Sequence, residues 1–499
     1  MLHISIKNDI FIWLFCQVFG NRTKHKLQQK NCGSYFLNIT IFKKIAAGLV
    51  LSSALLPAQA QEFRTSYFMQ TSNFRHQMNP ALIDAPYVSF PFMGNINVGA
   101  TGNMGYKNFI YKLEGNPLYD QTTFMSPTVS ASDFLGGLHD KNRADIYVNY
   151  NLFSVGFRGF KGMNIVELNL RSNTNITLPY ELFEFMKTAG EKEFYQLHDI
   201  GARSQNYMEL ALGHSHRIND RLTVGAKAKF LFGVAYADFK VNQLNLTMNG
   251  DEWRVQGDAR LKASVLKSEF DYEGPEKNAP DGRRVKGLDD VSFGMPGFGM
   301  AFDLGASYKV MDDLTVSAGL TDLGFISWGK TKQASSAGDY TFSGFNNIYA
   351  GSNNTGSNKL GDQFEDLGDD LEEMFSVYDD GETSTTQALA ATLNVGAEYT
   401  LPMYRRLHFG FLYTGRIHGL YSYHQAMLSA TVRPVNPIEI SVNTTAGGTG
   451  CSLGAALSLK AKHFNFYVGS DRILGKVNKQ FIPLNNLNAN VNFGMTFPL

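Results

Sequence analysis

The residues of this chain that could do chemistry are few. His214 and His216 flank Ser215, so in an extended strand both imidazoles would lie on one face, as two metal ligands do. A zinc site uses three or four protein ligands, and no third ligand stands near this pair in the sequence. The chain also contains no Gly-x-Gly-x-x-Gly motif for a dinucleotide. We therefore predict no metal site, no cofactor and no enzyme, although a catalytic triad dispersed along the sequence would leave no local motif.

Three cysteines occur: Cys16, Cys32 and Cys451. The first two lie in an N-terminal region that we expect to be removed, which leaves Cys451 alone in a glycine-rich turn. A single cysteine forms neither a disulfide nor a cysteine zinc site. Because unreactive cysteines are common, we interpret Cys451 as a small wall residue rather than a nucleophile.

Carboxylates gather in residues 330–386, the longest segment without a strand pattern. The segment begins rich in Ser, Gly and Asn and then becomes acidic. Acidic clusters can bind calcium through carboxylate oxygens, but the spacing of an EF-hand is absent. We favour a solvated loop with a short helix near Asp362–Phe375. The acidic residues are Asp362, Glu365, Asp366, Asp369, Asp370, Glu372, Glu373, Asp379, Asp380 and Glu382.

The N-terminus has the pattern of an export signal. Lys43 and Lys44 precede an apolar run, Ile45–Leu56, which ends in an Ala-x-Ala site at Ala60. This is the order of a secretory signal peptide, so we predict a signal over residues 43–60 with cleavage between Ala60 and Gln61. Residues 1–42 do not fit a signal, and we interpret them as a non-native or dispensable extension. A membrane anchor at residues 10–19 is the alternative, and it is too short for a spanning helix.

The body of the chain repeats with a period of two. From Met300 to Val310, apolar side chains alternate with small or polar ones, so a strand here has one apolar and one polar face. We count about 14 such strands between Asn95 and Phe497, each long enough to cross a bilayer when tilted. Other alternating segments are residues 166–171, 222–230, 393–400, 452–460 and 487–497.

Composition agrees with a membrane barrel. Aromatic residues make up 13% of the chain and charged residues only 18%, with 48 glycines. The formal net charge is zero, so nothing indicates a nucleic-acid surface. We predict an all-β fold, a transmembrane antiparallel barrel over residues 95–499. A secreted sandwich or propeller would also alternate, but its strands are usually shorter.

The polar faces of these strands would line the lumen. Their charges could pair into a network that fills the interior, or they could line a path for a solute. The sequence leaves both interpretations open. The residues concerned include Lys227, Lys229, Asp303, Lys309, Glu398 and Arg416.

Residues 179–197 have the periodicity of a helix instead. Leu182, Phe185, Met186 and Ala189 recur at helical spacing among charged side chains. We expect a loop helix that caps the mouth of the barrel, with a gate or docking helix as the alternative.

A family resemblance enters at the start of the mature chain. Asn79-Pro80-Ala81 stands shortly before the first strands, and this motif in this position resembles the long-chain fatty-acid transporter barrels of the outer membrane. The resemblance implies that residues 61–94 form a small hatch inside the lumen of a barrel of about 14 strands.

A broader resemblance covers most of the mature chain. Residues 301–308, 320–328, 467–471 and 492–497 look like an uncharacterised barrel family common in Bacteroidota. That family is grouped with the fatty-acid transporters and with the barrels of type IX secretion.

These resemblances imply a barrel in outer-membrane lipid that binds or passes a small hydrophobic molecule. The alternative is a structural or secretion-associated barrel that docks protein partners through its loops. An outer-membrane enzyme is a third possibility.

Overall fold

The computed structural model describes residues 63–91, 93–112, 121–188, 191–249, 252–272, 284–292, 294–336, 339–342, 377–448, 450–473 and 488–499. The predicted extension 1–42, the signal peptide 43–60 and its cleavage site at Ala60 and Gln61 lie outside these residues. So does the predicted helix at 362–375.

Eighteen strands form one antiparallel sheet that closes on itself. The last strand, β22, pairs with β1 and β2, and both of these also pair with β5, so the sheet has no free edge along this seam. At four places around the barrel, two strands pair with the same neighbouring strand and so count as one position in the wall. These couples are β1 with β2, β9 with β12, β13 with β14, and β15 with β16. The result is a closed barrel of 14 strand positions, as predicted.

The strands of this wall have the following bounds: β1 Tyr87–Ser89, β2 Ile96–Gly102, β5 Lys141–Gly159, β6 Gly162–Pro179, β7 Phe194–Arg217, β8 Leu222–Asn249, β9 Glu252–Ser264, β12 Gly297–Met311, β13 Leu314–Ser335, β14 Asp339–Phe342, β15 Tyr378–Ala388, β16 Ala391–Thr400, β17 Leu407–Ile417, β18 Tyr423–Val435, β19 Ile438–Gly447, β20 Ser452–Lys460, β21 Asn465–Ser470 and β22 Asn488–Pro498.

The two faces of the wall differ as the alternation predicts. On β12, Phe302 and Leu304 are 50% and 53% exposed on the outside, whereas Asp303 between them is fully buried inside. The same contrast recurs on β16 to β22. A continuous exterior of exposed apolar side chains is unfavourable in water, and lipid is the solvent that suits it.

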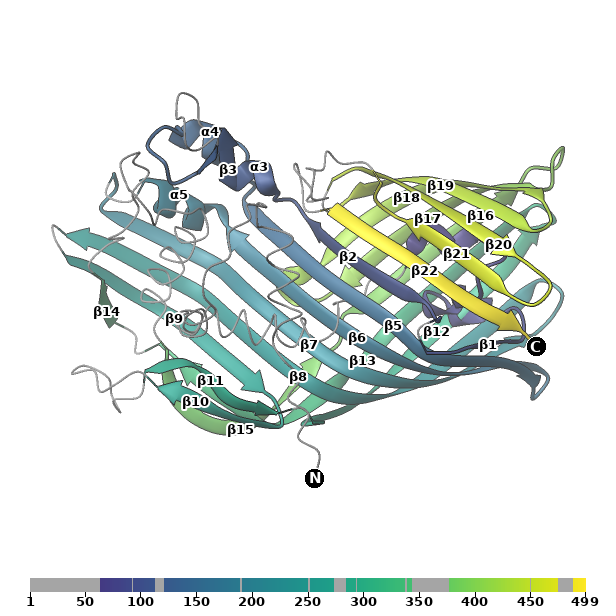
Figure 1. Ribbon diagram of the computed structural model, residues 1–499, viewed down its shortest axis with the longest axis horizontal. Helices are drawn as coiled ribbons and strands as arrows, with labels where there is room; N and C mark the ends of the chain where they lie inside the picture. The colour runs from purple at the N-terminus through teal and green to yellow at the C-terminus, as the bar shows by residue number, and fades with distance from the viewer. Residues whose placement is uncertain are drawn as a thin grey trace, which may run out of the picture.

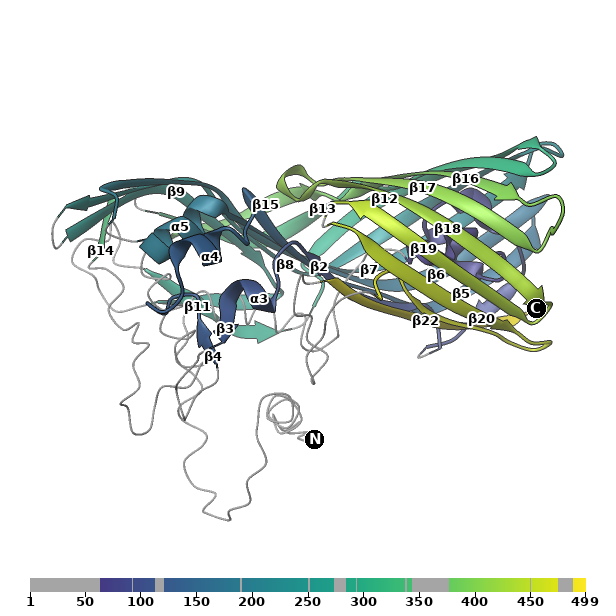
Figure 2. The ribbon, with the colours of Figure 1, turned by 90° about the horizontal axis from the view of Figure 1, so that it is seen from above.

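The two ends of the barrel are unlike. At one end, six short turns and the C-terminus lie together, and we call this the short-turn end (Figure 1). At the other end, strands β5 to β8 continue for 18 to 28 residues and carry a lobe. The lobe holds α3 Tyr106–Phe109, β3 Ile110–Lys112, β4 Gln121–Thr123, α4 Ala131–Leu135, α5 Tyr180–Thr188, β10 Lys267–Tyr272 and β11 Val285–Ser292 (Figures 1 and 2).

The lobe has its own apolar core. Phe124 and Phe134 stack with ring centroids 4.3 Å apart, and Phe109 and Phe183 pack against them. Leucines, valines and further aromatics from β7, β8 and β9 complete the cluster. Burial of this surface holds the short helices of the lobe, because α3 to α5 are too short to be stable alone.

Three predicted boundaries need correction. The predicted helical insert 179–197 contains α5, but residues 194–197 belong to β7. Residues 330–335, 339–342 and 378–386 of the predicted acidic loop are strands, in β13, β14 and β15. Within the predicted hatch segment, residues 87–89 form β1 of the wall. Among the described residues, no helix is both long and apolar enough to cross a lipid bilayer.

Candidate functional site

The first described segment, residues 63–84, lies inside the ring of strands, and we call it the hatch (Figure 2). It consists of three short 3-10 helices, η1 Arg64–Phe68, η2 Asn73–Gln77 and η3 Pro80–Leu82. The third helix begins as its sequence requires, because the Asn79 side chain accepts a hydrogen bond from the Ala81 N–H at 3.0 Å and Pro80 occupies the first turn. Most of its side chains are buried.

The Asn-Pro-Ala motif rests on a row of glycines. Gly225 on β8, Gly305 on β12 and Gly319 on β13 lie directly opposite one another in the strand register. A Cβ on Gly305 would stand 2.1 Å from the Oδ1 of Asn79, and one on Gly319 would stand 2.4 Å from the hatch backbone. No other residue type fits under the hatch backbone here, and we call this row the glycine seat.

Asn79 also ties the hatch to the seat by its amide. Its Nδ2 donates to the carbonyl of Ala306 at 3.2 Å and to the hydroxyl of Tyr67 at 3.3 Å. The Tyr67 hydroxyl in turn lies 2.9 Å from that of Ser317 on β13. The motif that the sequence singled out is therefore the point where hatch and wall interlock.

The other half of the hatch is held by two wall carboxylates. Asp471, which follows β21, accepts hydrogen bonds from the backbone N–H groups of Arg64 and Thr65 at 3.2 and 2.7 Å. Glu439 on β19 accepts from the N–H groups of Gln70 and Thr71 at 3.2 and 3.0 Å. We call these two contacts the carboxylate clasps. Asp471 ends a segment that carries the family resemblance, but the sequence indicated this role for neither acid.

His76 lies at the centre of the hatch in a fully buried hydrogen-bonded chain. The Nζ of Lys227 lies 2.9 Å from its Nδ1, and the hydroxyl of Tyr87 lies 2.9 Å from its Nε2. Lys227 also binds Glu167 at 2.6 Å. Burial, reinforced by the charge of Lys227, lowers the pKa of His76 to about 3, so the imidazole is neutral at physiological pH. The neutral ring accepts from lysine and donates to tyrosine.

The predicted charges of the lumen form a paired network. Lys229 binds Asp303 at 2.8 Å and Asp322 at 2.7 Å, and Glu209 lies 3.7 Å away. Asp322 adopts a left-handed conformation with φ of 60° at an irregularity of the β12–β13 register, which turns its carboxylate towards the lysine. The ion-pair interpretation is therefore confirmed for this part of the lumen.

The remaining predicted lumen charges have separate partners. Lys309 pairs with Asp312 at 3.1 Å beside a short turn. Glu398 faces His408 at 3.3 Å, and Arg416 donates to the Oδ1 of Asn173 at 3.1 Å. Arg416 also lines one small cavity together with Asp322 of the network around Lys229.

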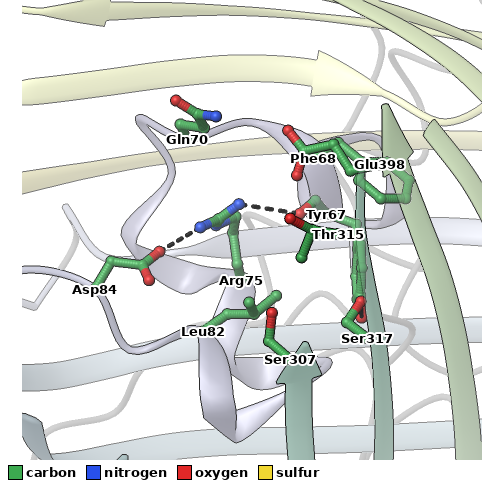
Figure 3. A pocket seen from close by; sticks show the side chains of 10 residues that line it. All are labelled: Tyr67, Phe68, Gln70, Arg75, Leu82, Asp84, Ser307, Thr315, Ser317 and Glu398. Carbon is green, nitrogen blue, oxygen red and sulfur yellow. Dashed lines mark hydrogen bonds and ion pairs between the residues drawn. The ribbon is translucent and has the colours of Figure 1, made fainter. Parts of the chain in front are cut away.

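The hatch separates two cavities. The larger, about 370 Å³, lies towards the short-turn end, and Arg75 crosses it between Asp84, with which it forms an ion pair, and the carbonyl of Tyr67 (Figure 3). A smaller cavity of about 30 Å³ lies towards the lobe, between Met78 and Arg416. The larger is lined by Tyr67, Phe68, Gln70, Arg75, Leu82, Asp84, Ser307, Thr315, Ser317 and Glu398.

Strand β13 shows that the hatch divides one lumen. Along its inward face, Thr315 and Ser317 line the larger cavity, Gly319 forms part of the seat, and Thr321 lines the smaller cavity. Successive inward positions therefore pass from one cavity, under the hatch, to the other.

The other candidate residues are not brought together with the hatch. His214 and His216 stack with ring centroids 5.8 Å apart, and His214 bonds Asn164 at 2.9 Å. No group of three metal-binding side chains occurs in the part of the chain that the structure describes. Cys451 is exposed and precedes β20, so its interpretation as a wall residue is wrong.

Two segments match catalytic patterns by letters alone. Residues 324–331 spell the Gly-x-x-x-x-Gly-Lys-Thr phosphate loop, but they lie inside strand β13 and no helix begins there. Residues 450–454 spell Gly-x-Ser-x-Gly, yet Ser452 begins a strand instead of the turn between a strand and a helix. Neither segment has the local structure that its chemistry needs.

These features define a class of protein, a closed β-barrel whose lumen is divided by a plug from its own N-terminal segment. The chain belongs to DUF5723, a family of unknown function, whose model matches residues 80–471. The predicted membership of an uncharacterised barrel family is confirmed to that extent, whereas the link to Bacteroidota and to type IX secretion stays a prediction. No curated protein matches the chain.

Three solved structures have chains that follow a course similar to that of this chain. The toluene transporter TbuX of Ralstonia pickettii is 9% identical, with 84% of this chain and 91% of that chain covered and a TM-score of 0.39. The monoaromatic hydrocarbon channel CymD is 9% identical, with 86% and 93% covered and a TM-score of 0.40. A FadL homologue of Pseudomonas aeruginosa is 9% identical, with 84% and 90% covered and a TM-score of 0.32.

Proposed function

We propose that this protein is an outer-membrane barrel that passes a small hydrophobic molecule, with the hatch as its gate. The observation that carries the proposal is the hatch itself, a separate segment that sits between two cavities of one lumen. A plug held by hydrogen bonds and close packing can leave its seat without breaking the wall, because the strand ladder does not include it.

The wall supports a place in an outer membrane. Its outer face is apolar, its inner face polar, and its short turns gather at one end with the C-terminus. This is the organisation of barrels whose short turns face the periplasm and whose long loops face outward. On that orientation, the lobe is the outer surface and the larger cavity opens on the periplasmic side.

The distribution of apolar surface supports a small hydrophobic cargo. At the outer end, Phe194 at the start of β7 and Tyr272 at the end of β10 are 52% and 40% exposed, whereas the rings of the lobe core are buried. Below the hatch, Tyr67, Phe68 and Leu82 line the larger cavity. Between them, the paired charges around Lys229 leave little open space for bulk water. We propose capture at the lobe, followed by hatch movement.

Mass spectrometry of the barrel extracted in mild detergent tests this function. We expect a recurrent apolar molecule in stoichiometric amount, which is lost when residues 63–84 are deleted. Cells that express the deletion should also take up the hydrophobic dye N-phenylnaphthylamine faster than cells with the intact chain. A barrel without ligand, together with unchanged dye uptake, would contradict the proposal.

The lobe favours a second candidate, a barrel that docks protein partners. Strands β5 to β8 extend beyond β16 to β22 to build this lobe, which gives the barrel a large structured surface at one end (Figure 1). A photo-crosslinking residue at the exposed position of Glu181 on α5 should then give one discrete protein adduct in cells. Discrete adducts without ligand or dye uptake would favour docking over passage.

A further inference from the structure

We infer that Glu439 and Asp471 hold the hatch closed, and that the hatch opens by swinging about its glycine seat. In this motion, residues 64–71 leave the wall while residues 78–81 stay in place. The inference rests on the proposed function, since it assigns the residues that position the gate, but its test does not depend on transport.

The two clasps are built alike. In each, one carboxylate oxygen accepts from the N–H of a residue before a threonine, and the other accepts from the threonine itself. The hydroxyls of Thr65 and Thr71 donate to that second oxygen at 2.5 Å in both cases. Hydrogen bonds to an ionised acceptor are about twice as strong as neutral ones. Two separate hatch segments, Arg64–Thr65 and Gln70–Thr71, are therefore bound in the same way at two points of the wall.

Each clasp also has a cation at similar distance. The Nε of Arg64 lies 3.8 Å from Asp471, and an Nη of Arg433 lies 3.9 Å from Glu439. These guanidinium groups compensate the burial of the two carboxylates. Each clasp therefore surrounds a buried carboxylate with a cation as well as with backbone N–H groups.

The surroundings of the clasps are polar and can part. Asn443 donates to the Thr65 hydroxyl at 2.6 Å, and the hydroxyl of Thr71 lies 2.8 Å from that of Ser458. Ring edges of Tyr67 and Phe68 lie over Gly396 and Gly410, and such side-chain contacts can rearrange by rotation. The hatch backbone in this half is not locked under the wall by shape.

The seat half is fixed in two further ways. The carbonyl of Pro80 and the N–H of Ala81 press on Gly225, where the contact atoms are backbone and cannot rotate away. The chain then enters wall strand β1 at Tyr87, so this end of the hatch is tethered covalently. A plug that is tethered at one end and clasped at the other swings about its tethered end.

Two cysteine reporters distinguish the halves. In a chain with Cys16, Cys32 and Cys451 replaced by serine, Ser72→Cys reports on the clasp half and Met78→Cys on the seat half, and both positions are buried. The measurement is the rate of modification by a charged, membrane-impermeant maleimide on the folded barrel in lipid vesicles. Heat-modified mobility on a gel confirms that each variant has folded.

We expect the Glu439→Gln, Asp471→Asn double variant to raise modification at position 72 by about tenfold and at position 78 by less than about twofold. The matched control is Glu398→Gln, since this acid faces the same lumen without accepting a hatch N–H, and it should change neither rate. Unchanged rates in the double variant would overturn the clasps. Equal increases at both positions would overturn the swing, because the hatch would then leave as one body. Either result stands apart from ligand binding and dye uptake, which test the proposed function.

Discussion

The two halves of the hatch are held by different physics. At the glycine seat, backbone lies on backbone, and the contact depends on the absence of side chains at Gly225, Gly305 and Gly319. At the clasps, Glu439 and Asp471 hold backbone N–H groups by charge. The packing of backbone on backbone at the seat contains no group that can gain or lose a charge. The hydrogen bonds of the clasps weaken when a carboxylate loses its charge. One short plug thus combines a permanent anchor with a contact that can be released.

The largest effect should come from filling the seat. In Gly319→Ala, the new Cβ meets the carbonyl of Met78 at 2.4 Å, so seating the hatch should cost about 1–3 kcal/mol more. Reporter modification at position 78 should rise steeply. Gly329→Ala on the same strand is the matched control, because its nearest neighbour, the carbonyl of Pro296, is 3.5 Å away. Similar rates in the two variants would show that the seat does not hold by shape.

Removal of the Asn79 side chain should have the next largest effect. Asn79→Ala deletes the cap of η3 and the bonds to Ala306 and Tyr67, which together contribute about 1–2 kcal/mol. Modification at position 78 should increase more than at position 72, the opposite of the clasp variants. Asn103→Ala, a surface change of the same type, should leave both unaffected.

Acid should weaken the seating of the whole hatch through His76, which lies in the sequence between the clasp half and the seat half. Its pKa of about 3 in the seated hatch is below the ordinary 6.5, so a released hatch binds a proton that the seated hatch does not. Seating is therefore unaffected above pH 6.5 and is lost progressively as the pH falls from 6.5 towards 3, by at most about 1.4 kcal/mol per unit. Lys227, Lys229, Glu167 and Tyr87 surround the ring. Reporter rates in His76→Gln and in the parent chain, from pH 7 to 5, check this once each rate is divided by that of the same cysteine in the unfolded chain at the same pH, which removes the ionisation of the thiol itself. The variant should lose most of the remaining slope.

The smallest effect should come from the ion pair at the mouth of the larger cavity. Arg75 is buried, but Asp84 is half exposed to water, so Asp84→Asn should weaken hatch seating by less than about 1 kcal/mol. Both reporter rates should stay within about twofold of the parent. A large increase would mean that this pair, and not the clasps, is the principal charged contact of the hatch.

The sequence predicted the wall far better than the hatch contacts. Alternation placed Phe302 outside and Asp303 inside because one face of each strand is the exposed outer face of the barrel and the other faces the lumen. The glycine seat could not be predicted, since glycine suits either face and the row at Gly225, Gly305 and Gly319 exists only in the register of three strands.

The clasps escaped prediction for a related reason. Glu439 alternates with apolar neighbours like any lumen residue, and its partner Thr71 lies in a segment without periodicity. The Asn-Pro-Ala motif was recognised by resemblance, and no rule of packing indicated it. Contacts between residues that are far apart in sequence and irregular in structure leave no local pattern.

The clasp at Asp471 also sets the order in which this protein can fold. Arg64 is bonded to an acid 407 residues further along the chain, and the seam between β2 and β22 joins the first and last parts of the wall. Loops of that length close slowly, and these pairs can form only when the C-terminal part of the chain has been synthesised. The plug is therefore synthesised before the wall and locked after it, so an unfinished barrel has an open lumen and a loose N-terminal segment. A truncated chain that lacks β21 and β22 would expose both to proteases, which gives the cell a means to distinguish finished barrels from unfinished ones.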